Sequence, residues 1–389
     1  MSVTAAKGFV ASGIACGIKG DGRTDLSLVA TSDGRPVPAA AVFTQNQMTA
    51  APVITTRNHL IRAAGHAAAV VLNSGNANAA NGRPGLDHAK RTCAGVAAQL
   101  GCEGHEVLVC STGLIGIPLP IDTIEAGIPQ LVAERAEGAD AGRAAADAIL
   151  TTDTVRKVSV AQRDTFVVGG MAKGAAMLAP NMATMLAVLT TDAEATPAQL
   201  KAALTNALPV SFNALSVDGC TSTNDTVILM ASGAAGPVDS FELAAAVAEV
   251  CTDLAAQMAG DAEGATKVVK VRVTGAVSDS QAEIAARKVA ESQLVKCSWY
   301  GKDPYWGRIA SELGSAGVSF DPDKVSVRYG PHLVADGGVT IDHDVAAVAA
   351  YMENRDLDVT ADLGLGRGEA LILTNDLTHA YIDENMGTS

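Results

Sequence analysis

The apolar residues of this chain fall into short, nearly continuous runs along the sequence. Most runs are bounded by Gly, Asn, Asp or Ser, which favour turns, so each run is typical of a buried strand. The predicted strands span residues 26–30, 68–72, 107–110, 185–189, 227–230, 268–273, 325–327 and 370–373.

Ala-rich stretches with helical character lie between these runs. They span residues 87–100, 140–150, 197–208 and 241–258. The last stretch gives the clearest signal, because Asp239 and Glu242 have the spacing of an N-terminal capping box. Its apolar residues recur along one helical face, and they are Leu243, Val247, Val250, Cys251, Leu254 and Met258. We therefore expect this helix to lie against a sheet.

The order of these elements indicates the fold class. Strands and helices interleave, with strand-only clusters expected near the C-terminus, so an α+β fold with α/β/β/α layering is favoured over a regular parallel barrel. The 389 residues suffice for two lobes or one large layered domain. Only 3% of residues are aromatic, so the core must be built from small aliphatic side chains. Residues 153–165 are polar and predict an exposed connection.

Charge and cysteine content narrow the functional classes. The formal net charge of −14 argues against a nucleic-acid or anionic-membrane partner, because phosphate binding needs clustered Lys and Arg. The seven cysteines form no C-x-x-C pair and predict reduced thiols rather than disulfides or a zinc site. The isolated histidines suggest no metal site either. Without a signal-like or 18-residue apolar stretch, we expect a cytoplasmic protein.

The glycine-rich segment 169–186 carries the most unusual chemistry. Pro180 would break a helix there, and the glycines would weaken one. Thr184, preceded by the small residue Ala183, stands at the start of a strand-like run. A threonine so placed can attack the carbonyl before it and become a new N-terminus, whose amine has a pKa of roughly 8 and can act as its own general base. Spacing alone leaves open that Ala183 and Thr184 are ordinary core-facing strand residues.

Other catalytic classes have weaker support. Cys110 or Cys220 would be conceivable as a nucleophile with a histidine, but no local signature accompanies either thiol. The segment around Lys173 lacks the glycine spacing and the Lys-Ser/Thr ending of a phosphate loop.

Seven ordered sequence blocks resemble one known family. The run Lys173 to Leu186 resembles the self-processing motif of the ornithine acetyltransferase family, also called bifunctional glutamate N-acetyltransferases. The other blocks occur in the family's order across the chain, at residues 73–78, 110–116, 151–154, 222–226, 261–267 and 376–381.

This resemblance implies a layered fold of the self-processing N-terminal-threonine type, with a smaller C-terminal α/β lobe. It implies cleavage between Ala183 and Thr184, giving an associated α chain (1–183) and β chain (184–389). Thr184 would then pass an acetyl group from N2-acetylornithine to glutamate by a ping-pong reaction in arginine biosynthesis.

The resemblance also implies individual site residues. Thr112 and Gly113 would form the oxyanion hole, although without the family they would be interpreted as a simple strand-ending turn. The implied substrate-binding residues are Thr151, Lys173, Thr184, Glu263, Asn385 and Ser389. Thr152 is a competing position if the alignment slips by one. Because the chain ends one residue earlier than is usual, Thr388 is an alternative to Ser389.

Several points stay open at this stage. Tyr305 stands where the family typically has Asn, with no evident consequence for substrate. No bound cofactor is implied, and the use of acetyl-CoA as a second acetyl donor is undecided. The family suggests a heterotetramer of two α and two β chains. The alternatives are an amide hydrolase or aminopeptidase on the same scaffold, with water as the acceptor, and a non-enzymatic binding protein.

Overall fold

The structure is a computed structural model, and it describes residues 2–179 and 185–387. The chain divides into two compact units. Among the described residues, the first unit contains 2–213 and 220–258, and the second contains 214–219 and 259–387.

A four-stranded sheet forms one layer of the first unit. Its strands, in spatial order, are β1 (Phe9–Ile14), β2 (Leu26–Thr31), β5 (Ala69–Asn73) and β6 (Val107–Ser111). β5 and β6 are parallel, and the other pairs are antiparallel. The strands β2, β5 and β6 are buried along their whole length, which explains why their sequences are continuous apolar runs.

A six-stranded sheet forms a second layer. In spatial order its strands are β4 (His66–Ala67), β3 (Val37–Phe43), β10 (Thr226–Pro237), β9 (Leu186–Glu194), β8 (Val167–Lys173) and β7 (Lys157–Gln162). β9 is antiparallel to β8 and parallel to β10. The predicted cleavage site falls between β8 and β9 in sequence, so this sheet joins the two predicted pieces.

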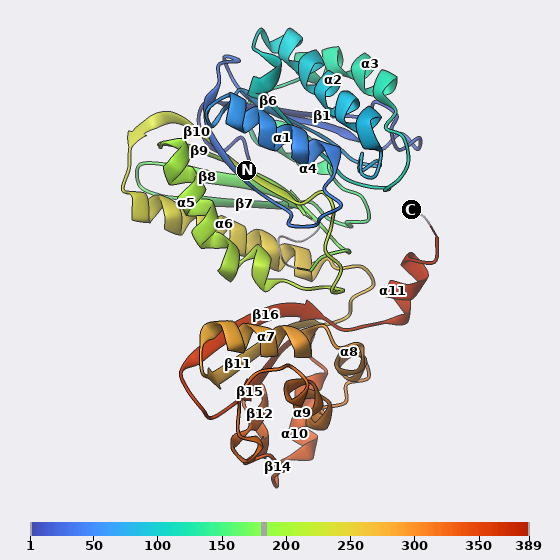
Figure 1. Ribbon diagram of the computed structural model, residues 1–389, viewed down its shortest axis with the longest axis vertical. Coiled ribbons are helices and arrows are strands. Elements are labelled where there is room, and N and C mark those ends of the chain that lie inside the picture. The colour runs from blue at the N-terminus through green and yellow to red at the C-terminus, as the bar shows by residue number, and fades with distance from the viewer. Residues whose placement is uncertain (1, 180–184, 388–389) are drawn as a thin grey trace. The chain divides into compact units, whose positions relative to one another are not determined.

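The two sheets pack face to face through one apolar cluster, which includes Leu72 and Leu108 of the first sheet and Val188 and Ile228 of the second. The helices α2 (Gly82–Leu100) and α3 (Ile121–Ala133) cover the outer face of the first sheet. The helices α5 (Pro197–Ala207) and α6 (Ser240–Gly260) cover the second (Figure 1). The predicted α/β/β/α layering of an α+β fold is confirmed.

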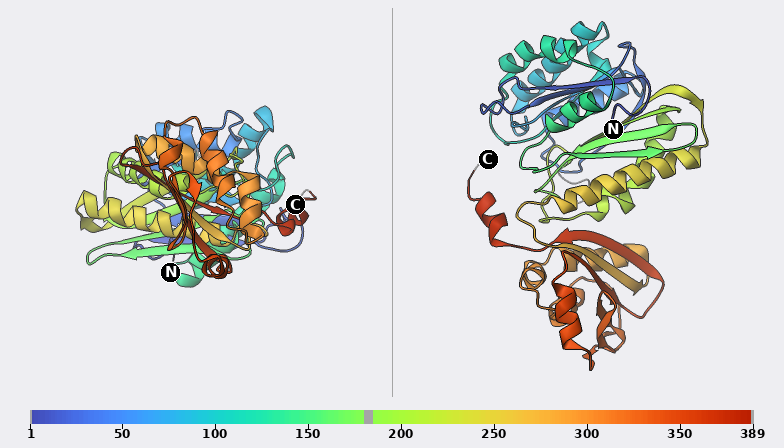
Figure 2. Two further views of the ribbon diagram at one scale, coloured as in Figure 1. Left: turned by 90° about the horizontal axis from the view of Figure 1, so that it is seen from below. Right: turned by 180° about the vertical axis from the view of Figure 1, so that it is seen from behind.

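Two further helices complete the first unit. α1 (Ala51–Arg62) packs beside β6, and the Thr56 hydroxyl donates to the Val109 carbonyl at 2.7 Å. α4 (Ala139–Asp147) packs against β1 and β2. Figure 2 shows the chain from two other sides.

Two adjacent glycines in β8 allow close packing on both faces of the second sheet. A Cβ on Gly169 would lie 2.1 Å from the Ser2 carbonyl oxygen. A Cβ on Gly170 would lie 2.8 Å from Val250 of α6. The glycine-rich sequence here is therefore a strand whose neighbours leave no room for side chains.

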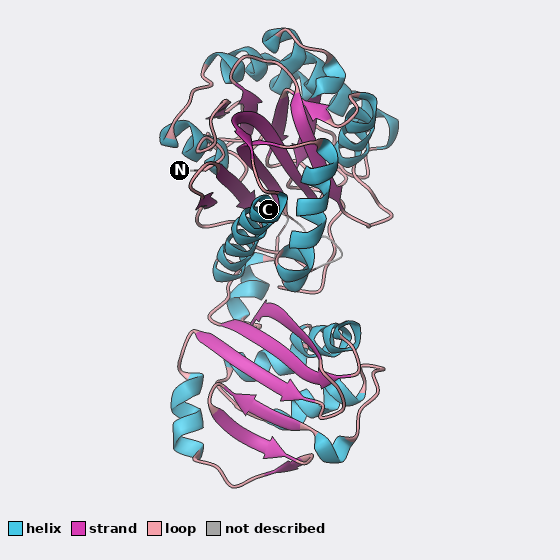
Figure 3. Cartoon of the chain, turned by 90° about the vertical axis from the view of Figure 1, so that its left-hand side faces the viewer, coloured by secondary structure: helices cyan, strands magenta, loops and turns pink. Residues whose placement is uncertain are grey.

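The second unit is the smaller α/β lobe, built on a six-stranded sheet with helices beside it (Figure 3). Its strands, in spatial order, are β14 (Val339–Thr340), β13 (His332–Asp336), β12 (Ser326–Tyr329), β15 (Asp356–Asp362), β11 (Val268–Ala276) and β16 (Gly368–Asn375). Its helices are α7 (Asp279–Ala290), α8 (Gln293–Tyr300), α9 (Trp306–Gly314), α10 (Val345–Met352) and α11 (His379–Glu384). Trp299, Tyr329 and Val271 are among the residues of its separate core.

Short 3-10 turns connect some of these elements, at Gly104–Glu106, Leu208–Val210, Phe212–Ala214 and Pro322–Lys324. Among the described residues, no helix combines the length and the apolar character that crossing a membrane requires.

A strand or helix is found at each of the eight predicted strands and four predicted helices. β9 and β10 extend well beyond their predicted ends, to Glu194 and Pro237, and α2 begins earlier, at Gly82. The capping of α6 is also seen, because the Glu242 N–H donates to the Asp239 carboxylate at 3.1 Å. One prediction is wrong, because residues 153–165 contain the strand β7 rather than an open connection. The strand-only clusters expected near the C-terminus are found, since β12, β13 and β14 follow one another without a helix, as do β15 and β16.

Candidate active site

The predicted nucleophile Thr184 and its neighbour Ala183 lie outside the described residues. The chain is described again from Met185, directly before β9. The Met185 N–H donates to the Asp225 carboxylate at 2.9 Å, and both residues are buried. The backbone that adjoins the predicted nucleophile is therefore held by a side chain at the start of β10.

The predicted oxyanion residues follow β6 in a tight turn. Gly113 has a φ of +127°, which only glycine adopts readily. A Cβ on Gly113 would lie 2.3 Å from the Gly75 carbonyl carbon and 2.5 Å from the Asn76 nitrogen. The turn therefore requires glycine both for its backbone conformation and for space.

The turn carries two hydrogen-bond donors, the Thr112 hydroxyl and the Gly113 N–H. Lys173 donates to the Thr112 hydroxyl oxygen at 3.3 Å, which leaves the hydroxyl proton available. Among residues 2–179 and 185–387, neither that hydroxyl nor the Gly113 N–H has an acceptor. Two such donors side by side can stabilise the negative oxygen of a tetrahedral intermediate.

Asp153 connects several predicted site residues. Its carboxylate accepts hydrogen bonds from Lys157 at 2.6 Å and from the Gly174 N–H at 2.7 Å, and it lies 3.7 Å from the Lys173 ammonium. Burial alone would raise the pKa of Asp153, but the ammonium groups of Lys173 and Lys157 and these hydrogen bonds hold it at about 2. The carboxylate is therefore ionised and holds Lys173 at the end of β8.

Thr151 belongs to the same group. Its N–H donates to the Asp153 carboxylate at 3.1 Å, and its hydroxyl lies 3.5 Å from the same oxygen. The competing residue Thr152 is exposed. The structure thus brings Thr151 and Lys173 together around Asp153, and Lys173 in turn contacts Thr112.

Asn224 and Asp225 link the two halves of this group. The Asn224 amide donates to the Ser111 carbonyl at 2.9 Å, directly before Thr112. Asp225 accepts from Met185, directly after Thr184. Burial raises the pKa of Asp225 well above its ordinary value. Two consecutive buried residues therefore hold the backbone on the oxyanion side and on the nucleophile side of the site.

Two other predicted residues meet in the second unit. The Asn385 amide donates to the Glu263 carboxylate at 2.7 Å. Glu263 is buried, whereas Asn385 is exposed at the end of α11. Ser389 and its alternative Thr388 lie outside the described residues.

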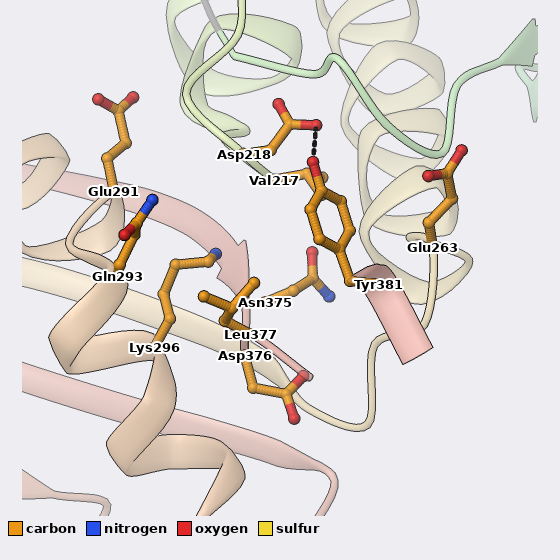
Figure 4. Close-up of a pocket in the computed structure, with 10 residues that line it drawn as sticks. All are labelled: Val217, Asp218, Glu263, Glu291, Gln293, Lys296, Asn375, Asp376, Leu377 and Tyr381. Carbon is orange, nitrogen blue, oxygen red and sulfur yellow. Dashed lines mark hydrogen bonds between the residues drawn. The ribbon is translucent and has the colours of Figure 1, made fainter. Parts of the chain in front are cut away.

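A cavity of about 130 Å³ lies beside Glu263 in the second unit (Figure 4). Its lining residues are Val217, Asp218, Glu263, Glu291, Gln293, Lys296, Asn375, Asp376, Leu377 and Tyr381. Four of these are carboxylates and one is a lysine, so the cavity is strongly polar.

The alternative cysteine nucleophiles gain no support from the structure. Burial raises the pKa of Cys110 to about 12, so its thiol stays protonated at neutral pH. Cys220 is exposed. In the part of the chain that the structure describes, no three His, Cys, Asp or Glu side chains cluster to hold a metal ion.

The sequence motifs indicate no role for Asp153, Asn224, Asp225 and Lys296. The first three lie in the blocks 151–154 and 222–226, whose density of polar residues was the available signal. Lys296 lies in no motif that was singled out.

Comparison with known proteins identifies relatives along the whole chain. The profile of the ArgJ family matches residues 10–387. An arginine biosynthesis bifunctional protein ArgJ from Mycobacterium tuberculosis (strain ATCC 25618 / H37Rv) is 47% identical over 397 residues, which cover 100% of this chain and 96% of that protein. The protein of the same name from Thermobifida fusca (strain YX) is 47% identical over 390 residues, with 100% of both chains covered.

A solved structure also matches part of the chain. It is the ornithine acetyltransferase of Mycobacterium tuberculosis complexed with ornithine, which is 45% identical, covers 46% of this chain and 94% of that chain, and has a TM-score of 0.44. The family profile and the two relatives that cover all of this chain confirm the resemblance found in its motifs. The chain belongs to the ArgJ family.

Proposed function

We propose that this chain transfers the acetyl group of N2-acetylornithine to glutamate, with Thr184 as the nucleophile. The chain first cleaves itself between Ala183 and Thr184, which gives Thr184 a free α-amino group. That amine takes the proton of the threonine hydroxyl, because its ordinary pKa of roughly 8 lies near neutrality.

In the first half-reaction the Thr184 hydroxyl oxygen attacks the acetyl carbonyl carbon of N2-acetylornithine. The carbonyl oxygen becomes negative and accepts hydrogen bonds from the Thr112 hydroxyl and the Gly113 N–H. The C–N bond then breaks, and the ornithine nitrogen leaves with the proton held by the α-amine. The acetyl group remains as an ester on Thr184.

In the second half-reaction the amine of glutamate attacks this ester carbon. A second negative oxygen forms in the same place and is stabilised by the same two donors. The α-amine takes a proton from the attacking nitrogen and gives it to the Thr184 oxygen as the C–O bond breaks, and N-acetylglutamate leaves. The two substrates use the site in turn, which is a ping-pong reaction.

The observation that carries this proposal is the pair of donors at Thr112 and Gly113, which have no acceptor among the described residues. Lys173 touches the same hydroxyl and offers a positive charge for a substrate carboxylate. The link through Asn224 and Asp225 ties this turn to the backbone next to Thr184. These features support an acyl-transfer site.

Further properties follow from the same proposal. Relatives named arginine biosynthesis bifunctional protein ArgJ support a role in arginine biosynthesis. We also propose acetyl-CoA as a second acetyl donor to glutamate. The pairing of β8 with β9 supports fragments that stay together after cleavage. We also propose a cytoplasmic heterotetramer of two α and two β chains. Thr151, Lys173, Glu263, Asn385 and Ser389 would bind the amino-acid substrates.

The test measures ornithine release from N2-acetylornithine by the purified protein, with and without glutamate. Transfer requires glutamate and yields N-acetylglutamate, whereas free acetate released at the same rate without glutamate would establish the hydrolase alternative. Thr112→Val removes the hydroxyl donor and should slow transfer about 100- to 1,000-fold. Thr205→Val on the exposed face of α5 is the matched control and should leave the rate unchanged.

A further inference from the structure

The cavity of the second unit is small. Its volume of about 130 Å³ is below the roughly 300–1,000 Å³ of complete ligand pockets. It therefore suits one end of a small molecule. Glu263, which the proposed function assigns to substrate binding, is one of its lining residues.

The carboxylates of this cavity already receive hydrogen bonds from the protein. Asp376 accepts from the Thr266 N–H and the Lys267 N–H, each at 2.9 Å, and from the Thr266 hydroxyl. The Ser216 hydroxyl donates to Glu291 at 2.9 Å.

The other two carboxylates of the cavity, Asp218 and Glu263, also receive hydrogen bonds from the protein. The Tyr381 hydroxyl donates to Asp218 at 3.3 Å, as Figure 4 shows, and Asn385 donates to Glu263. These four acidic side chains therefore have protein donors, and their negative charges are partly compensated.

Lys296 differs from these carboxylates, because two of its three N–H donors have no acceptor among the described residues. The side chain extends from α8 among the lining residues and is 5% exposed (Figure 4). Its ammonium donates one hydrogen bond, to the Thr374 hydroxyl at 2.9 Å, and has no other acceptor within the described residues. Buried Lys267 of the same unit instead donates to three backbone carbonyls, at 2.6, 2.7 and 3.2 Å.

This difference indicates that Lys267 has a structural role and that Lys296 can bind a ligand. A buried ammonium group has three N–H donors and loses stability when they are unsatisfied. Lys267 meets that requirement with protein carbonyls, so it is structural. Lys296 has two donors left, and a carboxylate supplies both acceptor oxygens and a negative charge for a buried ammonium group.

We propose that Lys296 binds the side-chain carboxylate of the glutamate acceptor. This inference rests on the proposed function. The two substrates that alternate in that reaction end differently, since ornithine carries a side-chain ammonium and glutamate a side-chain carboxylate. A cavity lined by both Glu263 and Lys296 can bind the side-chain ammonium of ornithine and, in turn, the side-chain carboxylate of glutamate.

The charge of Lys296 supports this role. Burial lowers its pKa to about 8, although the nearby carboxylates Asp218, Asp376 and Glu291 oppose this shift. The ammonium form therefore declines as the pH rises through about 8. We expect the KM for glutamate to rise over the same range, because the neutral amine binds a carboxylate more weakly.

The test compares Lys296→Met, Lys296→Arg and the control Lys288→Met, which removes a half-exposed lysine on α7. Steady-state kinetics give kcat/KM for N2-acetylornithine and for glutamate. We expect Lys296→Met to lower the ratio of the glutamate value to the acetylornithine value about 10- to 100-fold. Its preference for glutamate over glutamine should disappear, and the control should keep both. An equal fall for both substrates, or an unchanged preference, would overturn the proposal.

Lys296→Arg decides the case in which Lys296→Met does not fold. Arginine stays charged over this range, so the KM of the Lys296→Arg variant for glutamate should stay constant from pH 7 to pH 9, while that of the wild type rises. The same rise in both proteins would overturn the proposal.

Calorimetric titration with glutamate alone separates the proposed function from the inference about Lys296. Binding that depends on Lys296 without any acetyl transfer contradicts only the proposed function, and transfer with binding independent of Lys296 contradicts only this inference.

Discussion

At the scale of single residues, the site depends on charges that are buried and compensated. Asp153 lies between Lys157 and Lys173, and the side chains of all three are at most 5% exposed. An isolated buried charge would be costly, but the two ammonium groups and the Gly174 N–H stabilise this carboxylate. Lys173 keeps its position beside Thr112 for the same reason.

Asp153→Asn should therefore destabilise the protein. The substitution leaves two lysines buried beside a neutral group, and we expect the free energy of unfolding at pH 7 to fall by about 3 kcal/mol. The pKa of Asp153 is lowered from 3.8 to about 2, so its stabilisation is present above pH 4 and is lost as the pH falls towards 2. Urea unfolding at pH 7 and at pH 3 should show a smaller gap at the lower pH.

Asp140→Asn is the control, because Asp140 forms an exposed pair with Arg143. It should change the free energy of unfolding by less than about 1 kcal/mol. A gap between Asp153→Asn and the wild type that stays the same at both pH values would contradict this role of Asp153.

Asp225 gives the opposite pH dependence. Burial raises its pKa, so the neutral acid is favoured in the folded protein, and its stabilisation is lost as the pH rises. Asp225→Asn keeps an oxygen for the Met185 N–H and should become more stable than the wild type as the pH rises.

Asp225→Ala leaves that N–H unpaired, which costs about 1–3 kcal/mol, and should slow self-cleavage. Equal cleavage rates in the two variants would show that this hydrogen bond does not position the site.

The motifs that resemble the family predicted Thr112, Gly113, Thr151 and Lys173 as site residues, and the structure brings these residues together. The supporting role of Asp153 could not be predicted, because a single Asp among polar neighbours gives no sign that its side chain is buried. Burial of that kind depends on β7 and β8, which meet it only in the folded chain.

At the scale of elements, continuous apolar runs identified the central strands well. β7 was missed because buried and partly exposed residues alternate along it, and its first residue is the buried Lys157. β8 was missed because its glycines weaken any propensity signal. Both strands border the candidate site, where packing against neighbouring layers overrides local preference.

The helix α9 begins at an N-cap residue whose effect on stability can be tested. Tyr305 is its N-cap residue and has an extended backbone, with φ −74° and ψ 90°, but its side chain makes no capping hydrogen bond. Asn is among the best capping residues, so Tyr305→Asn should raise the free energy of unfolding by about 1 kcal/mol. Thermal unfolding of Tyr305→Asn and Tyr305→Ala separates the gained cap from the lost ring. Asn no more stable than Ala would contradict this account.

At the scale of the whole molecule, the second sheet of the first unit connects the predicted fragments. β8 precedes the predicted cleavage site and β9 follows it, and they pair from Val168↔Thr191 to Lys173↔Leu186. A cut between these strands breaks the chain but not the sheet. The fragments 1–183 and 184–389 should therefore elute together under native conditions and separate only in denaturant.

Self-cleavage at Thr184 is the central claim, and the intact mass of the denatured protein tests it most directly. The account predicts two wild-type fragments, one beginning at Met1 or Ser2 and the other at Thr184, and an uncut Thr184→Ala variant. A wild-type chain that remains whole at 389 residues after prolonged incubation, or a Thr184→Ala variant that is still cut there, would contradict the threonine mechanism.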